Sequence, residues 1–277
     1  MTYLVAAAER RDLAAVREAS PELWRQVRRY NLPVQLALAA AHEAGTHAEN
    51  IETAALISLA PCQAGSPDLY RWGELVVSYS PGKRLGEVRV NPTHTLHAVD
   101  NLALSAFAIA HGNHVYGLGL GGAAGQAWCG LEAVLERLAS GHETEALLMA
   151  GDQDSIERPG AGLGVALLFS RLPKPCAALG IMPHSRGKNV APRRGGADKM
   201  SALHSVSKAL PLGRLIKLIA VERQRQAEAH AVRPHAAAGV SELLAVMAQH
   251  RRGRLSYRVP VEHGDGVDQV TVVMERL

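Results

Sequence analysis

The sequence predicts an α/β protein in which helices cover a layered sheet. Continuous apolar runs of strand length alternate with segments of helical length as far as residue 170, and this alternation is typical of a sheet sandwiched between helices. Aromatic residues make up only 4% of the 277 residues, with two Phe in the whole chain. The core must therefore be mostly Leu, Val and Ala, which suits helices packed closely against a parallel sheet.

The first half of the chain contains the clearest elements. Apolar and small residues recur at helical spacing over 32–45, 97–111 and 123–140, and the first two of these helices are expected to stop at Gly45 and Gly112. The expected strands are residues 3–8, 53–60, 114–120, 145–152 and 162–170. Of these, 114–120, 145–152 and 162–170 are continuous apolar runs that we expect to be buried.

Beyond residue 170 the pattern is looser. Segment 184–199 combines Gly and Pro with five Lys or Arg residues and has no apolar periodicity, which predicts a surface loop. Helices are expected over 214–230 and 241–250. The final stretch, "LSYRVPVEHGDGVDQVTVVMERL", predicts a hairpin with its turn at "HGDG".

Composition narrows the class of protein. The formal net charge is +4 and the pI is about 9.1, which fits an acidic partner and carries no signature of nucleic-acid binding. The three cysteines, Cys62, Cys129 and Cys176, match neither a zinc motif nor a disulfide framework. We therefore expect a reducing compartment, no metal and no bound cofactor. Because no signal peptide and no apolar run of 18 residues is evident, a cytoplasmic location is expected.

A glycine cluster separates the expected strand 114–120 from the helix that follows it. Gly117, Gly119 and Gly122 have the spacing G-x-G-x-x-G, and backbone N–H groups at a helix N-terminus favour a phosphate. A dinucleotide site also needs an acidic residue at the end of the next strand, about 20 positions after the glycines. No acidic residue at a strand end has this spacing. Asp152 ends that strand but lies well past this position. Dinucleotide binding is therefore kept as an alternative function.

Cys129 is a second candidate for chemistry near this turn. A nucleophilic thiol is best activated at the first residue of a helix, where backbone N–H groups also stabilise an oxyanion. Cys129 lies deeper in the expected helix, between Trp128 and Leu131, which favours a small buried hydrophobic residue. A stand-alone acyl-transfer or condensing enzyme that uses Cys129 is the other alternative function.

The segment "VNPTHTLHAVDNLALSAFAIAHGNHVYGLGLGGAAGQAWCGLEAVLERLASGHETEALLMAGDQD" resembles the first half of a β-ketoacyl synthase, a family with the thiolase fold. The order of its features carries the resemblance: an Asn-Pro segment, a helix with Asn101, "AHG", a strand leading into the nucleophile turn, a helix, and "AGD" at the next strand end. The upstream "VRRYNLPVQLALAAAHEAG" and the downstream "GAGLGVALLFS" are similar as well. The resemblance covers roughly residues 24–172.

This resemblance implies a thiolase-like layered α-β-α fold with a shortened C-terminal half. Residues 1–172 would correspond to the N-terminal half of a ketosynthase, and residues 173–277 would complete the same domain. The family's catalytic cysteine begins a Cys-small-small-Gly run, and "GAAG" stands there in this chain, so Gly122 takes the nucleophile position. The family's active-site histidines stand in His-Gly-Thr and Gly-His motifs. This context is missing around the candidates His184, His204, His230, His235, His250 and His263.

A ketosynthase-like chain without its nucleophile is similar to a chain-length factor. The segment "NPTHTLHAVDNLALSAFAIAHG" is similar to the ketosynthase-like subunits of aryl-polyene and other type II polyketide systems. The resemblance implies a heterodimer with an active β-ketoacyl synthase, a continuous sheet formed through "HVYGLGL", and no catalytic residue in this chain. The residues implied to line the acyl tunnel or the interface are Asn101, His111, His114, Tyr116, Gly121 and Gly122.

An acidic acyl carrier protein is the second partner that the resemblance implies. The basic loop would bind it by charge complementarity, through Arg186, Lys188, Arg193, Arg194 and Lys199. Neither nucleic acid nor a membrane span is implied.

Overall fold

A computed structural model of the chain describes residues 1–59, 101–120, 126–153, 162–179, 215–226, 236–250, 252–263 and 266–277. The strands are β1 Thr2–Arg10, β2 Ala55–Leu59, β3 Gly117–Leu120, β4 Glu145–Gln153, β5 Gly162–Ser170, β6 Ala177–Leu179, β7 Ile216–Gln226, β8 Gly253–His263 and β9 Gly266–Arg276. The helices are α1 Leu13–Ala19, α2 Pro21–Val27, α3 Leu32–Gly45, α6 Leu102–His111, α7 Gln126–Ser140 and α8 Ala236–Gln249, with a short 3-10 turn at Ile51–Thr53.

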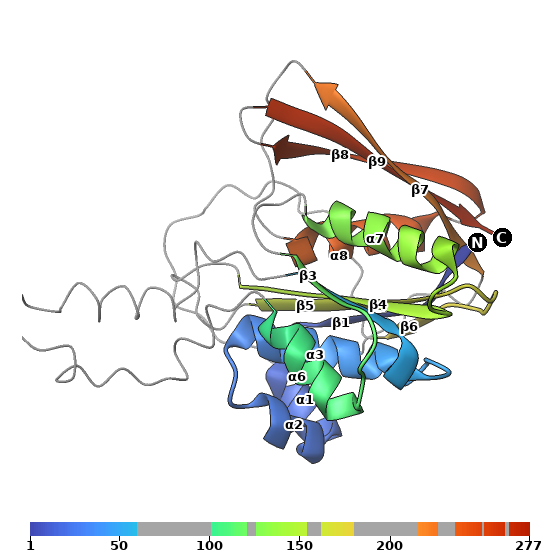
Figure 1. Cartoon of the computed structure of the whole chain (residues 1–277). Coiled ribbons are helices and arrows are strands. Elements are labelled where there is room, and N and C mark those ends of the chain that lie inside the picture. Colours follow the sequence, from blue (N-terminus) through green and yellow to red (C-terminus); the bar gives the residue numbers. More distant parts are fainter. Residues whose placement is uncertain are drawn as a thin grey trace, which may run out of the picture.

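The strands form a nine-stranded sheet in the order β3-β2-β4-β5-β1-β7-β9-β8, with β6 paired to β1. Strands β2, β3 and β4 are parallel to one another, and β5 is antiparallel to both β4 and β1. Helices α1, α2, α3 and α6 cover one face of the central strands (Figure 1). Helices α7 and α8 cover the other face, and β7, β9 and β8 lie beyond them.

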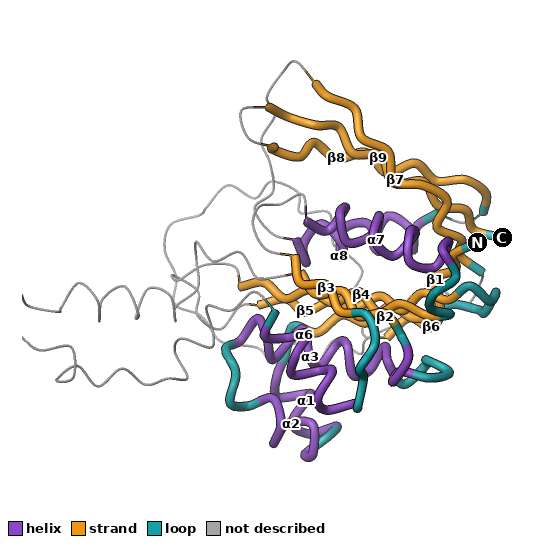
Figure 2. Tube along the Cα trace, in the orientation of Figure 1, coloured by secondary structure: helices purple, strands orange, loops and turns teal. Residues whose placement is uncertain are grey.

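The sheet divides at β1. Residues Thr2–Leu4 of β1 pair with β7, whereas Ala6–Ala8 pair with β6. A register shift between Leu4 and Ala6 marks the division, and such irregularities bend a strand. The β7-β9-β8 part consequently leaves the central layer and passes over α7 and α8, which Figure 2 shows as two helices between two groups of strands.

Each layer boundary has its own apolar core. The core between the two groups of strands includes Trp128 and Leu131 of α7 and Leu244 of α8, all at most 2% exposed. The core under the N-terminal helices contains Phe107 of α6 and many small residues of α3. Leu, Val and Ala dominate both cores, as the composition predicts.

Buried carboxylates hold α8 against the central strands. The Ser241 hydroxyl donates to Glu9 Oε2 at 2.6 Å, and the backbone N–H of Ala237 donates to Asp152 Oδ2 at 2.7 Å. Glu9 and Asp152 are both buried at strand ends. An acceptor at the first turn of a helix satisfies a backbone N–H that has no partner within the helix, so these contacts set the position of α8.

Helix α3 lies directly on the backbone of β4 and β5. The helix begins at Asn31, whose side chain accepts from the N–H of Val34 at 3.3 Å, and Pro33 occupies its first turn. A Cβ atom on Gly151 would overlap the carbonyl oxygen of Pro33, and one on Gly164 would overlap that of Leu36. Glycine is therefore required at both strand positions.

The structure confirms most of the predicted elements. Helices α3, α6, α7 and α8, strands β1, β2, β4 and β5, and the terminal hairpin, in which His263 pairs with Gly266, all lie where the sequence predicts them. The fold class is confirmed as α/β. The expected loop 184–199 lies outside the described residues.

Two structural predictions are wrong. The helix expected over 214–230 is strand β7 in its described part, because Ile216–Gln226 pairs along its length with β9 and this pairing overrides the helical propensity of its Glu, Arg and Gln residues. The strand predicted to be buried within 114–120 is β3, which lies at the sheet edge. Gly117 and Gly119 are exposed there.

We predict that Gly164→Ala strongly destabilises the protein and that Gly239→Ala does not. The added methyl group at Gly164 would meet the backbone of α3, so the free energy of unfolding should fall by at least about 2 kcal/mol. At Gly239, inside α8, the methyl group would make an ordinary 3.4 Å contact with Trp128, and the gain in helix propensity of up to about 1 kcal/mol favours the variant. Urea denaturation of both variants measures the difference, and equal stabilities would contradict the assigned packing of α3.

Candidate functional site

Strand β3, like β8 at the opposite end of the strand order, has a free edge within the described sheet. Strand β3 ends the strand order, with β2 on its other side. The N–H of Leu56 in β2 donates to the Tyr116 carbonyl at 2.9 Å. Because successive residues of a strand point their backbone groups to opposite sides, those of Gly117 and Gly119 face away from β2. Beside them, Val115 is 48% exposed.

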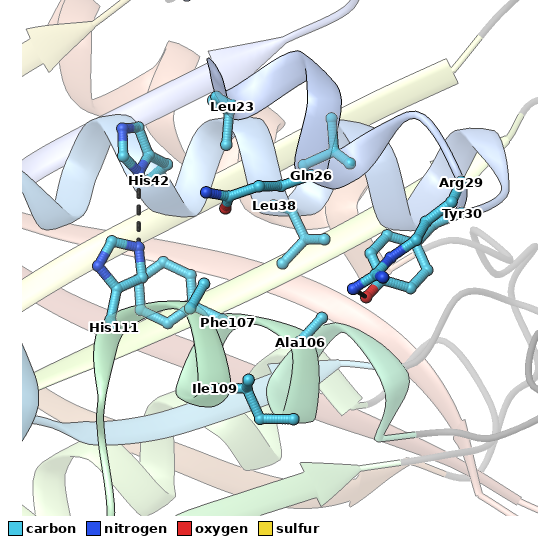
Figure 3. A pocket seen from close by; sticks show the side chains of 12 residues that line it. Leu23, Gln26, Arg29, Tyr30, Leu38, His42, Ala106, Phe107, Ile109 and His111 are labelled. Carbon is cyan, nitrogen blue, oxygen red and sulfur yellow. Dashed lines mark hydrogen bonds between the residues drawn. The ribbon is translucent and has the colours of Figure 1, made fainter.

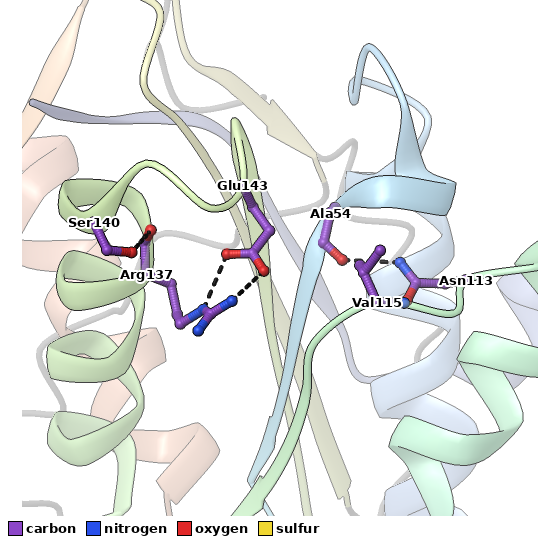
Figure 4. A network of polar contacts seen from close by, with 6 residues as sticks. All are labelled: Ala54, Asn113, Val115, Arg137, Ser140 and Glu143. Carbon is purple, nitrogen blue, oxygen red and sulfur yellow. Dashed lines mark hydrogen bonds and ion pairs between the residues drawn. The ribbon is translucent and has the colours of Figure 1, made fainter.

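Asn113 fixes the turn that leads from α6 into this edge. Gly112 ends α6 in the left-handed conformation, with φ of 63°. The buried Asn113 amide then donates to the carbonyl oxygens of Ile51 at 2.7 Å and Ala54 at 2.8 Å, and its side-chain oxygen accepts from the N–H of Val115 (Figure 4). One side chain thus ties the start of β3 to the start of β2.

Arg137 supports the same edge from α7. Its guanidinium lies 4.0 Å from the centroid of the Tyr116 ring, within the range of a cation–π contact. It is also bonded to the Glu143 carboxylate at both oxygens, with Nε 2.9 Å from Oε2 (Figure 4). The hydrogen bond with Glu143 raises the pKa of Arg137. Tyr116 is therefore held in place at the entry to β3.

Helix α6 packs across β3 at its two glycines. A Cβ on Gly117 would lie 3.2 Å from Leu104 Cδ2, and one on Gly119 would lie 3.1 Å from Asn101 Cβ. Asn101 precedes α6 as its N-cap residue, makes no side-chain cap hydrogen bond and is exposed. Asn101 therefore lies beside Gly119 on the α6 side of β3, whereas the Tyr116 ring faces α7 on the other side.

His111 and His114, two of the predicted tunnel or interface residues, have different surroundings. His114 is exposed. His111 turns toward α3, where its Nε2 lies 3.4 Å from Nδ1 of His42, and its ring packs on Phe107 with centroids 4.2 Å apart (Figure 3). Burial lowers the pKa of both His42 and His111, and the neighbouring His42 lowers that of His111 further. Sequence reasoning missed His42, because 69 residues separate it from His111.

The glycines of the G-x-G-x-x-G motif do not form a phosphate-binding turn in the described part. Gly117 and Gly119 are paired within β3, opposite Leu56 and Ser58. A dinucleotide fingerprint needs its glycines in the turn between strand and helix. The pairing of Gly117 and Gly119 within β3 therefore argues against dinucleotide binding. Gly121 and Gly122 lie outside the described residues.

Cys129 lies in the first turns of α7 and is only partly buried. Its neighbour Trp128 is 2% exposed and packs against Tyr257 of β8, with ring centroids 5.9 Å apart. Of the cysteines that the structure describes, the buried one is Cys176, and burial raises the pKa of its thiol to about 12. A neutral thiol of this kind is a poor nucleophile at neutral pH.

The remaining predicted residues divide between placed and undescribed positions. His250 Nε2 lies 3.2 Å from the carbonyl oxygen of Gly253, in the turn between α8 and β8. The described residues contain no group of three His, Cys, Asp or Glu side chains able to hold a metal ion, and none of their helices is long and apolar enough to cross a membrane. The following candidates lie outside the described residues: His184, His204, His230, His235, Arg186, Lys188, Arg193, Arg194 and Lys199.

Comparison with known proteins identifies the fold. No family model and no curated protein matches the sequence. One similar structure is that of the ketosynthase ApeO in complex with its chain length factor ApeC from Xenorhabdus doucetiae; the match has 12% identity and a TM-score of 0.54, and covers 98% of this chain and 99% of that chain. The ishigamide ketosynthase/chain length factor matches with 14% identity, a TM-score of 0.54, and coverage of 90% and 82%.

A ketosynthase domain gives a third match. The oxazolomycin ketosynthase domain OzmH KS7 from Streptomyces albus JA3453 is 9% identical, with a TM-score of 0.54, and the match covers 100% of this chain and 75% of that one. The chain therefore has the thiolase-like α/β fold of ketosynthases. At these identities the likeness concerns the fold.

We predict that Asn113→Leu destabilises the protein by about 1–3 kcal/mol, because it leaves the Ile51 and Ala54 carbonyls without their shared donor. Chemical denaturation measures the loss. His114→Leu, one residue further along and exposed, is the control and should stay within about 0.5 kcal/mol of the parent protein. A similar loss in both variants would show that Asn113 does not fix the turn.

We also predict that stability falls as the pH drops below about 6.5. The folded-state pKa values of His42 and His111 lie below the ordinary 6.5, so the unfolded chain binds more protons in that range. Their contribution is fully present above pH 6.5 and is lost as the pH falls through the folded-state pKa values. Thermal unfolding between pH 5 and 8 should show a shallower pH dependence for His42→Gln/His111→Gln than for His114→Gln, and equal slopes would contradict this assignment.

Proposed function

We propose that this chain is a non-catalytic, chain-length-factor-type partner of an active β-ketoacyl synthase. The observation that carries the proposal is the open edge of β3, where the backbone groups of the exposed Gly117 and Gly119 face away from β2 and are unpaired within the described sheet. Exposed strand edges invite pairing with another chain. The ketosynthase fold supports a partner of the same fold that adds its own strand there.

The residue at the nucleophile position supports a role without catalysis. The "GAAG" run begins at Gly122 and stands between β3 and α7 in the chain, where the sequence resemblance puts the catalytic cysteine of a ketosynthase. Glycine has no side chain to form a thioester. We infer that the partner supplies the cysteine and the histidines, while this chain contributes part of the wall of the acyl tunnel.

Residues Asn101, His114, Tyr116, Gly121 and Gly122 are our candidates for that wall or for the interface beside it. Asn101 lies against Gly119 on the α6 side of β3, and Tyr116 directly precedes the strand. His111 turns instead to the outer helical layer, so we assign it no part in the tunnel. The product class that we propose is a polyketide or aryl polyene, with acyl intermediates delivered by an acidic acyl carrier protein.

Co-expression with the ketosynthase encoded beside it tests the proposal. Size-exclusion chromatography should give a one-to-one complex, and intact mass after incubation with malonyl- and acyl-carrier protein should show added acyl mass on the partner alone. Acyl mass on this chain, abolished by Cys129→Ala, would contradict the proposal and favour the stand-alone enzyme.

Val115→Glu should disrupt the complex, because it introduces a charge beside the pairing edge without altering a buried side chain. Leu172→Glu is the matched control: Leu172 is 51% exposed, close to the 48% of Val115, and lies away from β3, after β5. We expect the first variant to weaken pairing at least about tenfold, or about 1.4 kcal/mol, and the second to leave it unchanged. Equal binding by the two variants would exclude the β3 edge as the interface.

A further inference from the structure

Two histidines from different helices face each other where α3 and α6 come together (Figure 3). His42 lies in the last turn of α3, and His111 is the last residue of α6. Nδ1 of His42 is 3.4 Å from Nε2 of His111, and the ring centroids are 5.4 Å apart. The proposed function gives this pair no part.

The separation of the two nitrogens suits a shared metal ion better than a hydrogen bond. Hydrogen bonds donated by N–H groups have donor–acceptor distances of about 2.7–3.2 Å, so the 3.4 Å between these rings is long. Two imidazole nitrogens that each lie about 2.0–2.1 Å from a tetrahedral ion are roughly 3.3–3.4 Å from one another. An ion therefore fits between the two rings with little movement of either side chain.

The electrostatic surroundings of the pair favour a cation. The C-terminal end of a helix carries partial negative charge, and both histidines lie at the C-terminal ends of their helices. Burial lowers the pKa of His42 and of His111, so both rings are neutral at pH 7. A neutral imidazole has a nitrogen lone pair that can bind a metal.

A groove beside the pair gives room for the other ligands of an ion. It has a volume of about 220 Å³ and is lined by residues of α2, α3 and α6, among them Leu38, Phe107 and both histidines (Figure 3). In the part of the chain that the structure describes, no group of three His, Cys, Asp or Glu side chains is placed to hold a metal. Water or another small ligand in the groove would therefore take the remaining positions.

We propose that His42 and His111 form a two-histidine binding site for a divalent transition-metal ion. Imidazole nitrogen suits ions such as Zn²⁺, Ni²⁺ and Cu²⁺, whereas Mg²⁺ and Ca²⁺ take oxygen ligands. The bound ion joins α6, whose Leu104 lies against Gly117 of β3, to α3, which lies on β4 and β5. It thereby links the support of the β3 edge to the centre of the sheet.

Titration of Zn²⁺ into the full chain, after treatment with a chelator, tests the site. Competition with a metal-indicator dye should reveal one site per chain, and added Zn²⁺ should raise the thermal unfolding temperature, because the ion joins both helices only in the folded state. His42→Gln and His111→Gln should each weaken binding at least about tenfold and remove this shift, since each removes one of two protein ligands.

The matched controls are His47→Gln and His114→Gln. Both histidines are exposed, and they follow α3 and α6 respectively, so these variants should bind Zn²⁺ like the parent protein. Cu²⁺ gives a second readout: its electron paramagnetic resonance spectrum should show coupling to two nitrogens in the parent protein and lose it in both the His42 and the His111 variants. Thermal unfolding without metal checks that each variant is folded.

Three results would overturn the inference. Binding to either the His42 or the His111 variant with the affinity of the parent protein would place the ion elsewhere in the chain. An equal loss in the two controls would show that the effect is not specific to the pair. Absence of Zn²⁺ binding to the parent protein would leave a shared proton as the only link between the two rings.

Discussion

The rest of the structure depends on the contact between the backbone of α3 and the backbones of β4 and β5. At Gly151 and Gly164 no Cβ separates helix from strand, so α3 lies closer to the sheet than ordinary side chains would permit. This contact fixes the position of α3, and with it the turn before the helix. The Gln35 amide donates to the carbonyl oxygens of Arg28 and Tyr30. The end of α2 is consequently held relative to the central strands.

The opposite face of the sheet is organised by a different constraint. Helices α7 and α8 lie between two groups of strands, so both of their sides must be apolar or satisfied by buried partners. Trp128 fills the space toward β8, and a Cβ on Gly130 would come within 2.7 Å of Leu148, so α7 also approaches β4 closely. The hydrogen bonds to Glu9 and Asp152 join α8 to the central strands. The division of the sheet at β1 makes this arrangement possible.

Local sequence patterns were sufficient for the elements that are buried on both sides. The run "EALLMAGD" and the helix from Leu32 are stable only when they are buried, and the structure confirms both as β4 and α3. Pattern reasoning failed at β7, where long-range pairing with β9 decides the conformation. It also misjudged β3, because a continuous apolar run does not distinguish a buried strand from one at an open edge.

The candidate site divides in the same way. Resemblance of the segment around residues 90–154 correctly led to the fold, which a ketosynthase/chain length factor structure shares at only 12% identity. The contacts that position the edge were not predictable, because they join residues far apart in the chain: Asn113 with Ala54, and His42 with His111. Nothing in the spacing of these polar residues distinguishes them from solvated ones.

Helix α6 links the open edge of β3 to the outer helical layer. Its Leu104 lies against Gly117 of β3, whereas Phe107 lies against Gly45 of α3 and the ring of His111. Glycine at positions 117 and 119 lets the helix approach the strand, because a Cβ at either position would come within 3.2 Å of α6 or of its N-cap residue Asn101. Within the described residues this face of β3 is therefore covered, whereas its backbone edge is open. The proposed function requires this combination, since a partner strand can pair with the edge without displacing the helix that supports it.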